Sequence, residues 1–348
     1  MICTEEVIKN LLVNKKKGEV INILPVPGSL NSDVYKVIMN NGTKYLAKKY
    51  LKYKGDKRNR LLTEYNSLSF LWEHDIRNIP EPVCSSKNYN IGIYSFIKGN
   101  KLKSEDISMK DIFLVAEFLE KLYKLSILHK NSNQPAASEA CFSIHFYINQ
   151  IEKRLKKFKS LAEKKHISNL LLDYIQHDFI PFFKQIKEFI KTKALFYNIN
   201  IRQEINIEER ILSPSDFGFH NTIKCNDNSL VFIDFEYYGW DDPAKLISDF
   251  YHHPGVPLPY KFREAFFQEV SKFLPENIIL RLPFFYLLSG LNWCLIMLNI
   301  FLREKKEQVV YEEFCTKQLI KSQKKLKTNI YEFQNRIFPV SLLKNHYK

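Results

Sequence analysis

The stretch SPSDFGFHNTIKCNDNSLVFIDFEYYGWDDPAK, residues Ser213 to Lys245, decides which fold this chain can adopt. Within it, the run LVFIDF reads as a buried apolar strand, yet Asp234 stands among its apolar residues. Removing a carboxylate from water costs several kcal/mol unless an opposite charge or hydrogen bonds compensate it. We therefore expect a partner for the charge of Asp234 nearby.

The residues before Asp234 predict a hairpin that supplies such a partner. The segments TIKC and LVFI flank NDNS (Asn226 to Ser229), which we expect to form a four-residue turn with Cys225 paired to Leu230. In that register Asn221 lies directly opposite Asp234, with the two Cβ atoms about 5 Å apart. A carboxylate oxygen and an amide oxygen at this separation suit Mg2+, which takes few protein ligands and completes its octahedron with phosphates and water. The alternative is that Asp234 ends the strand and accepts hydrogen bonds from backbone amides.

A second carboxylate, Asp216, stands five residues before Asn221 on the expected loop SDFGFH. A carboxylate beside a metal-bound phosphate can orient an attacking hydroxyl and accept its proton. Phosphoryl transfer needs these parts: a cation, a positioned acceptor, a base and a cradle for the phosphates. Together, Asp216, Asn221 and Asp234 indicate a phosphotransferase site.

These residues also carry a resemblance to known proteins. Asp216-x4-Asn221 followed by IDFEY resembles the catalytic and metal-binding segments of the aminoglycoside phosphotransferase and choline kinase families, which share the protein-kinase-like fold. The run DFEYYGWDDPAKLISDF is similar to the pattern that follows the metal-binding aspartate in these families, and IDFEY is particularly choline-kinase-like. The resemblance extends, more faintly, over about the first 100 residues and into the C-terminal helices.

The resemblance implies a role for each residue that matches. Asp216 matches the catalytic base, and Asn221 and Asp234 match the magnesium ligands. Upstream, PGSLNSDVYKV resembles the loop that covers the nucleotide phosphates, with Gly28 and Ser29 at its tip. Taken alone, this glycine-poor segment would be an ordinary hairpin turn.

Further matches lie in the first hundred residues. Lys48 resembles the strand lysine that contacts the α- and β-phosphates, and Lys49, on the opposite strand face, is the alternative if the register is shifted by one. Glu64 resembles the helix glutamate that pairs with this lysine. The segment YSFIKG resembles the hinge whose backbone receives the adenine, which implicates Ser95 and Ile97.

The chain departs from the family pattern at two places. Members usually have His-Gly-Asp or His-Asn-Asp before the catalytic loop, whereas this chain has Pro214-Ser215-Asp216. That histidine supports the loop rather than the chemistry, so the departure concerns loop packing. A second family aspartate, four residues beyond Asp242, is replaced here by Leu246, with Asp249 nearby.

The rest of the chain predicts two lobes of different composition. Residues 19–26, 34–40 and 43–50 read as strands, with a hairpin turn at Asn41-Gly42, and a helix and one more strand follow. From about residue 106 the periodicity is mostly helical. We expect a bilobal α+β fold: a small β-rich nucleotide-binding lobe at 1–99 and a large, mainly helical lobe at 100–348 with the catalytic and substrate-binding residues.

Charge and cysteine usage limit the possible partners. The net charge is +14, but the lysines are spread along the chain without a compact basic block, so a nucleic-acid partner is not expected. The charge mildly favours a neutral or anionic acceptor over a polycationic antibiotic. The six cysteines lie far apart, without a CxxC pair or histidines at zinc-like spacing, which is typical of reduced thiols in a cytoplasmic protein.

One segment has the length of a membrane span. LPFFYLLSGLNWCLIMLNIFL (Leu282 to Leu302) is long enough to cross a bilayer. It contains Ser289, Gly290, Asn292 and Asn299, and no other segment of this kind occurs in the chain. We therefore expect a buried core helix rather than a membrane span. The N-terminus lacks the basic-then-apolar order of a signal peptide.

The sequence favours an ATP-dependent kinase that uses Mg2+ and transfers a γ-phosphoryl group to the hydroxyl of a small molecule. An amino alcohol, a sugar and an aminoglycoside-like acceptor all stay open, as do ATP against GTP and the oligomeric state. One alternative is a catalytically inactive nucleotide-binding or scaffold protein on a kinase-like fold, which the missing histidine and the glycine-poor loop suggest. A basic nucleic-acid-associated protein is a second alternative, and a steep salt dependence of its binding would reveal it.

Overall fold

The computed structural model describes residues 3–27, 31–53, 56, 58–163, 169–302 and 308–337. These residues form two compact units. The first comprises Met1–Ala140 and Leu212–Trp240, and the second comprises Cys141–Ile211 and Asp241–Lys348. The predicted boundary at residue 99 divides the chain into two consecutive lobes, whereas each of these units combines two separate ranges of the chain. The lobe boundary therefore stays a prediction.

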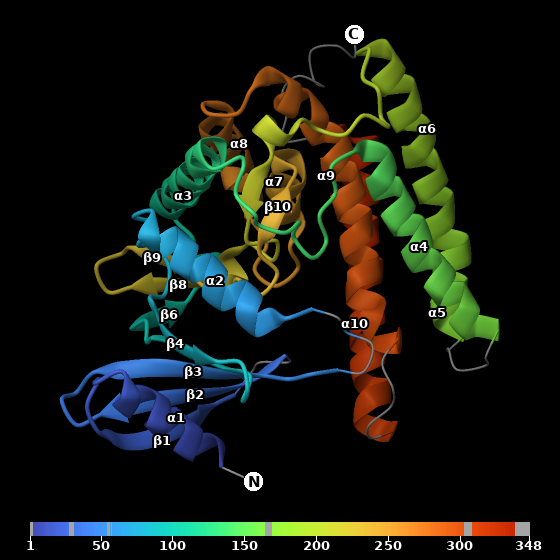
Figure 1. Ribbon diagram of the computed structural model, residues 1–348. Coiled ribbons are helices and arrows are strands. Elements are labelled where there is room, and N and C mark those ends of the chain that lie inside the picture. The colour runs from blue at the N-terminus through green and yellow to red at the C-terminus, as the bar shows by residue number, and fades with distance from the viewer. Residues whose placement is uncertain are drawn as a thin grey trace. The chain divides into compact units, whose positions relative to one another are not determined.

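The first unit is built on a five-stranded antiparallel sheet with the order β1-β2-β3-β5-β4 (Figure 1). Its strands are β1 (Val20–Val26), β2 (Ser32–Met39), β3 (Lys44–Tyr50), β4 (Pro82–Ser86) and β5 (Ile91–Ser95). The Asn41-Gly42 turn joins β2 to β3 as expected, because Gly42 adopts the left-handed backbone (φ 81°) that such turns require.

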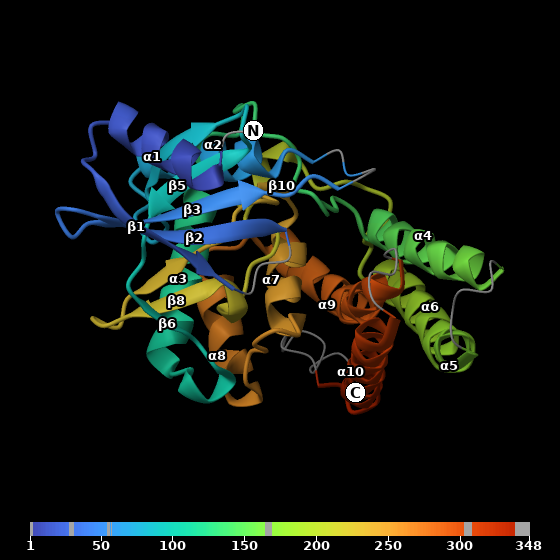
Figure 2. The ribbon, with the colours of Figure 1, turned by 90° about the horizontal axis from the view of Figure 1, so that it is seen from below.

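An N-terminal helix that the sequence analysis did not assign, α1 (Thr4–Asn14), completes the core of this sheet. Val7, Ile8 and Leu12 are buried on one helix face and join Val37 and Ile93 of the sheet in a single apolar cluster. Figures 1 and 2 both show α1 lying against the sheet. Strand β4 was also missed by the sequence analysis.

The remaining elements of the first unit include the long helices α2 (Arg60–Glu73) and α3 (Met109–Leu128). Helix α2 begins after Asn59, whose side-chain oxygen accepts a hydrogen bond from the Leu62 N–H at 3.2 Å. A small sheet has the order β6-β8-β9. It consists of β6 (Gly99–Lys101), β8 (Thr222–Cys225) and β9 (Leu230–Phe232), and β7 (Ile211–Ser213) pairs with β10 (Gly239–Asp241).

The predicted register of the β8–β9 hairpin is wrong by one residue. Lys224, not Cys225, is paired with Leu230. The Cys225 N–H donates to the Ser229 carbonyl at 2.9 Å, which leaves a three-residue turn. Asn228 ends this turn in the left-handed region (φ 64°). A type I turn followed by one left-handed residue is a common three-residue hairpin connection, and asparagine tolerates that conformation.

The new register changes the neighbour of Asn221. The Asn221 carbonyl accepts from the Ile233 N–H at 2.9 Å, so Ile233 rather than Asp234 lies opposite Asn221. Asp234 follows the end of β9 with φ 70°, outside the strand, and 36% of its side chain is exposed. The expectation of a fully buried aspartate within a strand is therefore corrected.

The second unit is mainly helical. It contains α4 (Ile144–Glu163), α5 (Asn169–Asp173), a π-helical turn (Tyr174–Phe179), α6 (Ile180–Phe196), α7 (Pro243–His252), α8 (Tyr260–Ser271), α9 (Glu276–Met297) and α10 (Gln308–Gln334). Short 3-10 helices occur at Ser104–Asp106 and Phe219–Asn221 in the first unit and at Ile207–Glu209 and Leu298–Leu302 in the second. Helices α4 and α6 run side by side (Figures 1 and 2).

Helix α9 is the centre of the second unit, in contact with α4, α7 and α10. Together with the 3-10 turn that follows, it spans Glu276–Leu302 and is long and apolar enough to cross a membrane by length and composition. Within its most apolar window, 67% of the residues are buried inside the structure, as a core helix requires.

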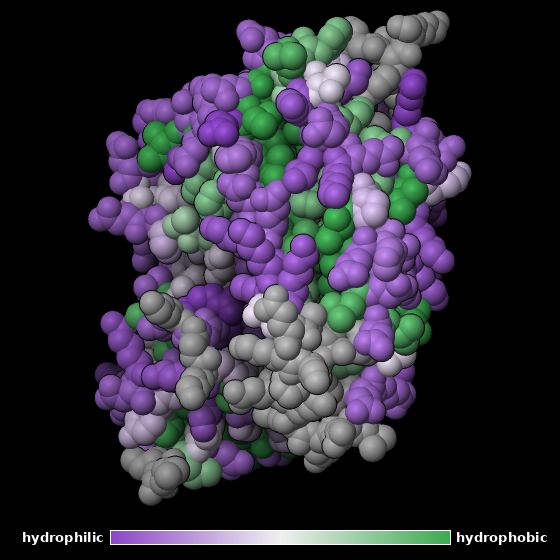
Figure 3. Space-filling model, turned by 90° about the vertical axis from the view of Figure 1, so that its right-hand side faces the viewer, coloured by the Kyte–Doolittle hydropathy of each residue, from purple (hydrophilic) through white to green (hydrophobic). Residues whose placement is uncertain are grey.

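Figure 3 shows one face of the molecule, on which hydrophilic residues cover most of the coloured surface and hydrophobic residues form smaller groups between them.

Candidate functional site

Lys48 is the centre of a buried ionic cluster in the first unit. Its Nζ donates to Glu64 Oε2 at 2.7 Å and to Asp234 Oδ1 at 2.9 Å. Only 8% of Lys48 is exposed. Burial by itself would lower the pKa of Lys48, but the charges of Asp234 and Glu64 outweigh it and raise that pKa well above its usual value. Lys48 therefore stays charged and compensates the charge of Asp234.

Strand alternation separates Lys48 from its neighbour Lys49. The Lys49 Nζ donates to Thr4 Oγ1 at 2.9 Å and so points toward the start of α1. The structure thus brings Lys48 together with Glu64 and Asp234 and directs Lys49 elsewhere.

Glu64 is held in place by the sheet as well as by Lys48. It is buried on α2, and the Tyr50 hydroxyl donates to its Oε2 at 2.6 Å. The Tyr50 hydroxyl also lies 2.8 Å from that of Tyr94 on β5. These contacts connect α2 with β3 and β5, so the position of Glu64 depends on how α2 sits on the sheet.

Asp216 and Asn221 lie on the loop between β7 and β8. The Asn221 Nδ2 donates to the Asp216 carbonyl at 3.0 Å and lies 3.4 Å from Asp216 Oδ2. His220 Nε2 lies 3.4 Å from Asp216 Oδ1, an ion pair when the imidazole is protonated. Because Asn221 also pairs with Ile233, the residue before Asp234, this loop and the Lys48 cluster are joined by backbone contacts.

Other groups hold this loop, where the family pattern expected from the sequence has a histidine and this chain has Pro214. The Ser215 N–H donates to the buried Ser213 Oγ at 2.9 Å, and the Asp216 N–H donates to the Pro214 carbonyl at 2.9 Å. Ser215 adopts the left-handed region (φ 69°), which is costly for serine and persists because these bonds hold it. The loop before Asp216 is thus built without the histidine.

The sequence analysis missed the third carboxylate of the Lys48 cluster, Glu236, which joins Glu64 and Asp234. Oxygens of Glu64, Asp234 and Glu236 all lie within 4.8 Å of one another. Glu236 is only 3% exposed and accepts a hydrogen bond from Asn31 Nδ2 at 2.7 Å, while Arg60 Nε lies 3.5 Å away. Burial and the nearby charge of Asp234 raise the pKa of Glu236 to about 7. The glutamate of IDFEY was the available signal, but its partner Asn31 lies on a distant part of the chain.

The other residues predicted for the site are not among the residues of this cluster. Ser95 is the last residue of β5, and its N–H donates to the Glu81 carbonyl at 2.9 Å, so that N–H is not the donor an adenine ring would meet. Ile97 lies on the connection from β5 to β6. Gly28 and Ser29 lie outside the described residues.

The oxygen donors of the cluster fit a magnesium ion. Asp234, Glu236 and Glu64 offer carboxylate oxygens, and Mg2+ prefers a few such ligands together with water and phosphate. The Asp234 side chain is partly exposed to solvent, and the hydrogen bond from Lys48 is made to its Oδ1. The Asn221 amide donates through Nδ2, which leaves its oxygen outside that hydrogen bond.

Comparisons with known proteins bear on the fold. No family model matches the chain. No curated protein matches it either. Among solved structures, a choline kinase from Streptococcus pneumoniae aligns with 93% of this chain and 99% of its own length at 14% identity and a TM-score of 0.58.

Two further structures give the same result. A Plasmodium vivax ethanolamine kinase aligns with 94% of this chain and 86% of its own length, at 19% identity and a TM-score of 0.55. Spectinomycin phosphotransferase, solved with ADP and spectinomycin, aligns with 94% of this chain and 98% of its own length, at 15% identity and a TM-score of 0.60. The predicted α+β, protein-kinase-like fold is confirmed, and it is the fold of these small-molecule kinases.

Proposed function

We propose that this protein is an ATP-dependent small-molecule kinase that transfers the γ-phosphoryl group of ATP to a hydroxyl group. The observation that supports this most is the Lys48 ammonium held between Glu64 and Asp234. A cation fixed in this way can contact phosphate oxygens without losing its charge on burial. The likeness to choline, ethanolamine and spectinomycin kinases agrees with this function.

Each residue of the site has a distinct role in the proposed reaction. Asp216 orients the acceptor hydroxyl and accepts its proton as the bond to phosphorus forms. Lys48, positioned by Glu64, binds the phosphates that are not transferred. Asn221 and Asp234 would hold Mg2+, which when bound would supply positive charge to compensate that of the phosphates.

Glu236 extends the proposed metal site. It lies beside Asp234 in the same group of oxygens, and Asn31 and Arg60 keep its carboxylate oriented. We propose that it supports Mg2+ binding directly or through a water molecule. Ser95 and Ile97 border the adenine site in this proposal, and Gly28 and Ser29 cover the phosphates.

The acceptor belongs to one of three classes: an amino alcohol such as choline or ethanolamine, a sugar, or an aminoglycoside-like compound. A screen of these acceptors with γ-labelled ATP and Mg2+ tests the function. We expect labelled product with members of one class, and its loss in Asp216→Asn. If no member of any class is labelled while ATP still binds, the alternative of an inactive nucleotide-binding protein is supported.

Besides the few glycines of PGSLNSDVYKV, that alternative rests on the replacement of the usual histidine before the catalytic loop by Pro214. The hydrogen bonds from the Ser215 and Asp216 N–H groups hold the loop without it. We therefore favour the active enzyme.

A further inference from the structure

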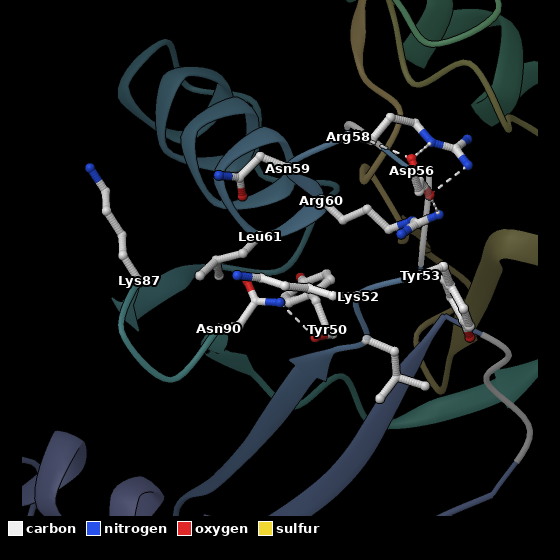
Figure 4. Close-up of a pocket in the computed structure, with 11 residues that line it drawn as sticks. Tyr50, Lys52, Tyr53, Asp56, Arg58, Asn59, Arg60, Leu61, Lys87 and Asn90 are labelled. Atoms are coloured by element: carbon white, nitrogen blue, oxygen red, sulfur yellow. Dashed lines mark hydrogen bonds and ion pairs between the residues drawn. The ribbon is translucent and has the colours of Figure 1, made fainter.

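A pocket of about 370 Å3 lies in the first unit and includes none of the proposed catalytic or metal-binding residues. Three segments line it: the end of β3 with the residues after it, the first turn of α2 with the residues before it, and the turn between β4 and β5 (Figure 4). Its volume is in the range of small-molecule sites, which begins at about 300 Å3. It is thus large enough for a small ligand and too small for a folded partner.

The lining of this pocket is strongly cationic. Lys52, Arg58, Arg60 and Lys87 line it, and Asp56 is the single carboxylate among the lining residues that the structure describes. Asp56 is already paired, with Arg58 Nε at 2.8 Å and Arg60 Nη2 at 2.5 Å. Hydrogen bonding from Arg58 holds the pKa of Asp56 well below its usual value, so this carboxylate stays charged. Among the described lining residues, four cations and one carboxylate give an excess of three positive charges, and Glu236, which does not line the pocket, offsets part of the charge of Arg60.

Arg60 is a fixed rather than a mobile cation. It is only 5% exposed, and its guanidinium lies 5.8 Å from the Tyr53 ring centre. Its Nε makes no hydrogen bond among the described residues, and Glu236 Oε1 lies 3.5 Å from it. In Figure 4, Arg58, Asp56 and Arg60 meet at one end of the pocket, while Lys87 lies toward the other.

The N-terminal end of α2 adds positive electrostatic potential to the pocket, which favours the binding of an anion. The helix has 14 residues, and its first turn, RLLT, contains no acidic side chain. Helix N-termini carry a partial positive charge and unpaired N–H groups, which attract anions. Asn59, which caps the helix, lines the pocket next to Arg60.

We propose that this pocket binds a small anion that carries a phosphoryl group. Arginine matches two oxygens of a phosphoryl group with its planar fork, and lysine adds a point charge. The occupant would touch both β3 and α2, because Tyr50 and Leu61 line the pocket. Tyr50 also bonds Glu64, so an occupied pocket would steady the helix that positions Glu64 against Lys48. This binding does not depend on the proposed kinase function.

Calorimetry with inorganic pyrophosphate tests the proposal directly. The full chain is titrated at low ionic strength in EDTA, without nucleotide, so that metal-dependent binding is suppressed. The pocket variant is Lys52→Ala with Lys87→Ala, and the charge-matched control is Lys44→Ala with Lys101→Ala; all four lysines are exposed. We expect the pocket variant to bind pyrophosphate at least about 10-fold more weakly, because it lacks two charge-assisted contacts to the anion. The control pair should bind as the wild type does, and Lys48→Ala tests whether pyrophosphate enters the proposed nucleotide site instead.

Three results would overturn the proposal. The first is no measurable binding to the wild type. The second is binding that Lys48→Ala abolishes and the pocket variant retains, which would place pyrophosphate in the proposed nucleotide site. The third is equal binding of citrate and pyrophosphate to the pocket, which would assign it to anions in general rather than to phosphoryl groups.

Discussion

At the scale of single residues, the proposed chemistry depends on three charged groups, Asp234, Lys48 and Asp216. Asp234 does not need a metal ion to compensate its charge, because Lys48 lies 2.9 Å away. The same contact keeps Lys48 charged where a phosphate would meet it. Asp216 lies apart from this pair and contacts Asn221. The two aspartates therefore have different surroundings, which implies different functions.

Substituting each aspartate separates these functions. Asp234→Asn should remove Mg2+-assisted ATP binding and turnover together, because it removes a proposed metal ligand and the partner of Lys48. Asp216→Asn should leave ATP binding nearly intact while turnover falls about 10²–10⁴-fold, the usual contribution of a general base. Calorimetry of Mg-ATP binding beside the transfer assay checks both. Equal loss of binding in the two variants would show that Asp216 is structural or binds metal.

The neighbouring lysines provide a matched pair on one strand. Lys48→Ala should weaken ATP binding by about 1.5–3 kcal/mol, the range for hydrogen bonds to charged groups. Lys49→Ala removes only a contact to Thr4, so ATP binding should stay close to the wild-type value. Titrations of both variants with Mg-ATP decide this, after circular dichroism has shown that each is folded. A larger loss in Lys49→Ala would contradict the assigned roles.

Glu236 should make the stability of the protein depend on pH. Its pKa rises from 4.5 to about 7 on folding, so the folded state binds the proton more tightly than the unfolded state does. This contribution to stability is fully present below pH 4.5 and is lost as the pH rises through about 7. Glu236→Gln carries no such proton, so the wild-type stability minus that of the variant should fall over this interval. Thermal melts of both proteins across it provide the test, and a constant difference would contradict the raised pKa.

At the scale of elements, the β8–β9 hairpin shows how one residue sets a register. Its three-residue turn requires Asn228 in the left-handed region, where a β-branched side chain is disfavoured. Asn228→Val should therefore destabilise the protein by about 1–2 kcal/mol, while Asn228→Gly should be neutral or slightly stabilising. Asn226→Val, also exposed but without a positive φ, is the control. Urea titrations measure these differences, and equal costs for both valine variants would contradict the observed register.

At the scale of the whole molecule, the most apolar helix, α9, forms part of the hydrophobic core of the second unit. Helix α9 contacts α4, α7 and α10, and most of its apolar window is buried. Exposing such a helix to lipid would require these contacts to be lost. We predict that the expressed protein is recovered without detergent. Recovery only in the membrane fraction, with no release by carbonate washing, would show that Glu276–Leu302 is a membrane span.

The sequence was sufficient to predict many of the local elements and to name candidate polar residues for the site. The strands β1 to β3, the Asn41-Gly42 turn and the helix that carries Glu64 were predicted, because periodicity and turn chemistry are properties of neighbouring residues. The family resemblance added the expectation that Lys48 and Glu64 pair. The sequence did not reveal α1 or β4, whose short apolar patterns matter only once the sheet exists.

The contacts between distant polar groups could not be predicted from the sequence and follow from the tertiary fold. Asp234 is bonded to a lysine 186 residues away, and Glu236 to an asparagine 205 residues away. Such contacts depend on how strands and helices pack, which no local pattern specifies. The register of the β8–β9 hairpin is likewise not specified by the local sequence, because a turn of three residues and a turn of four both suit NDNS. A one-residue shift moves every side chain to the other face, so the neighbours of Asn221 followed from the folded backbone and not from the spacing.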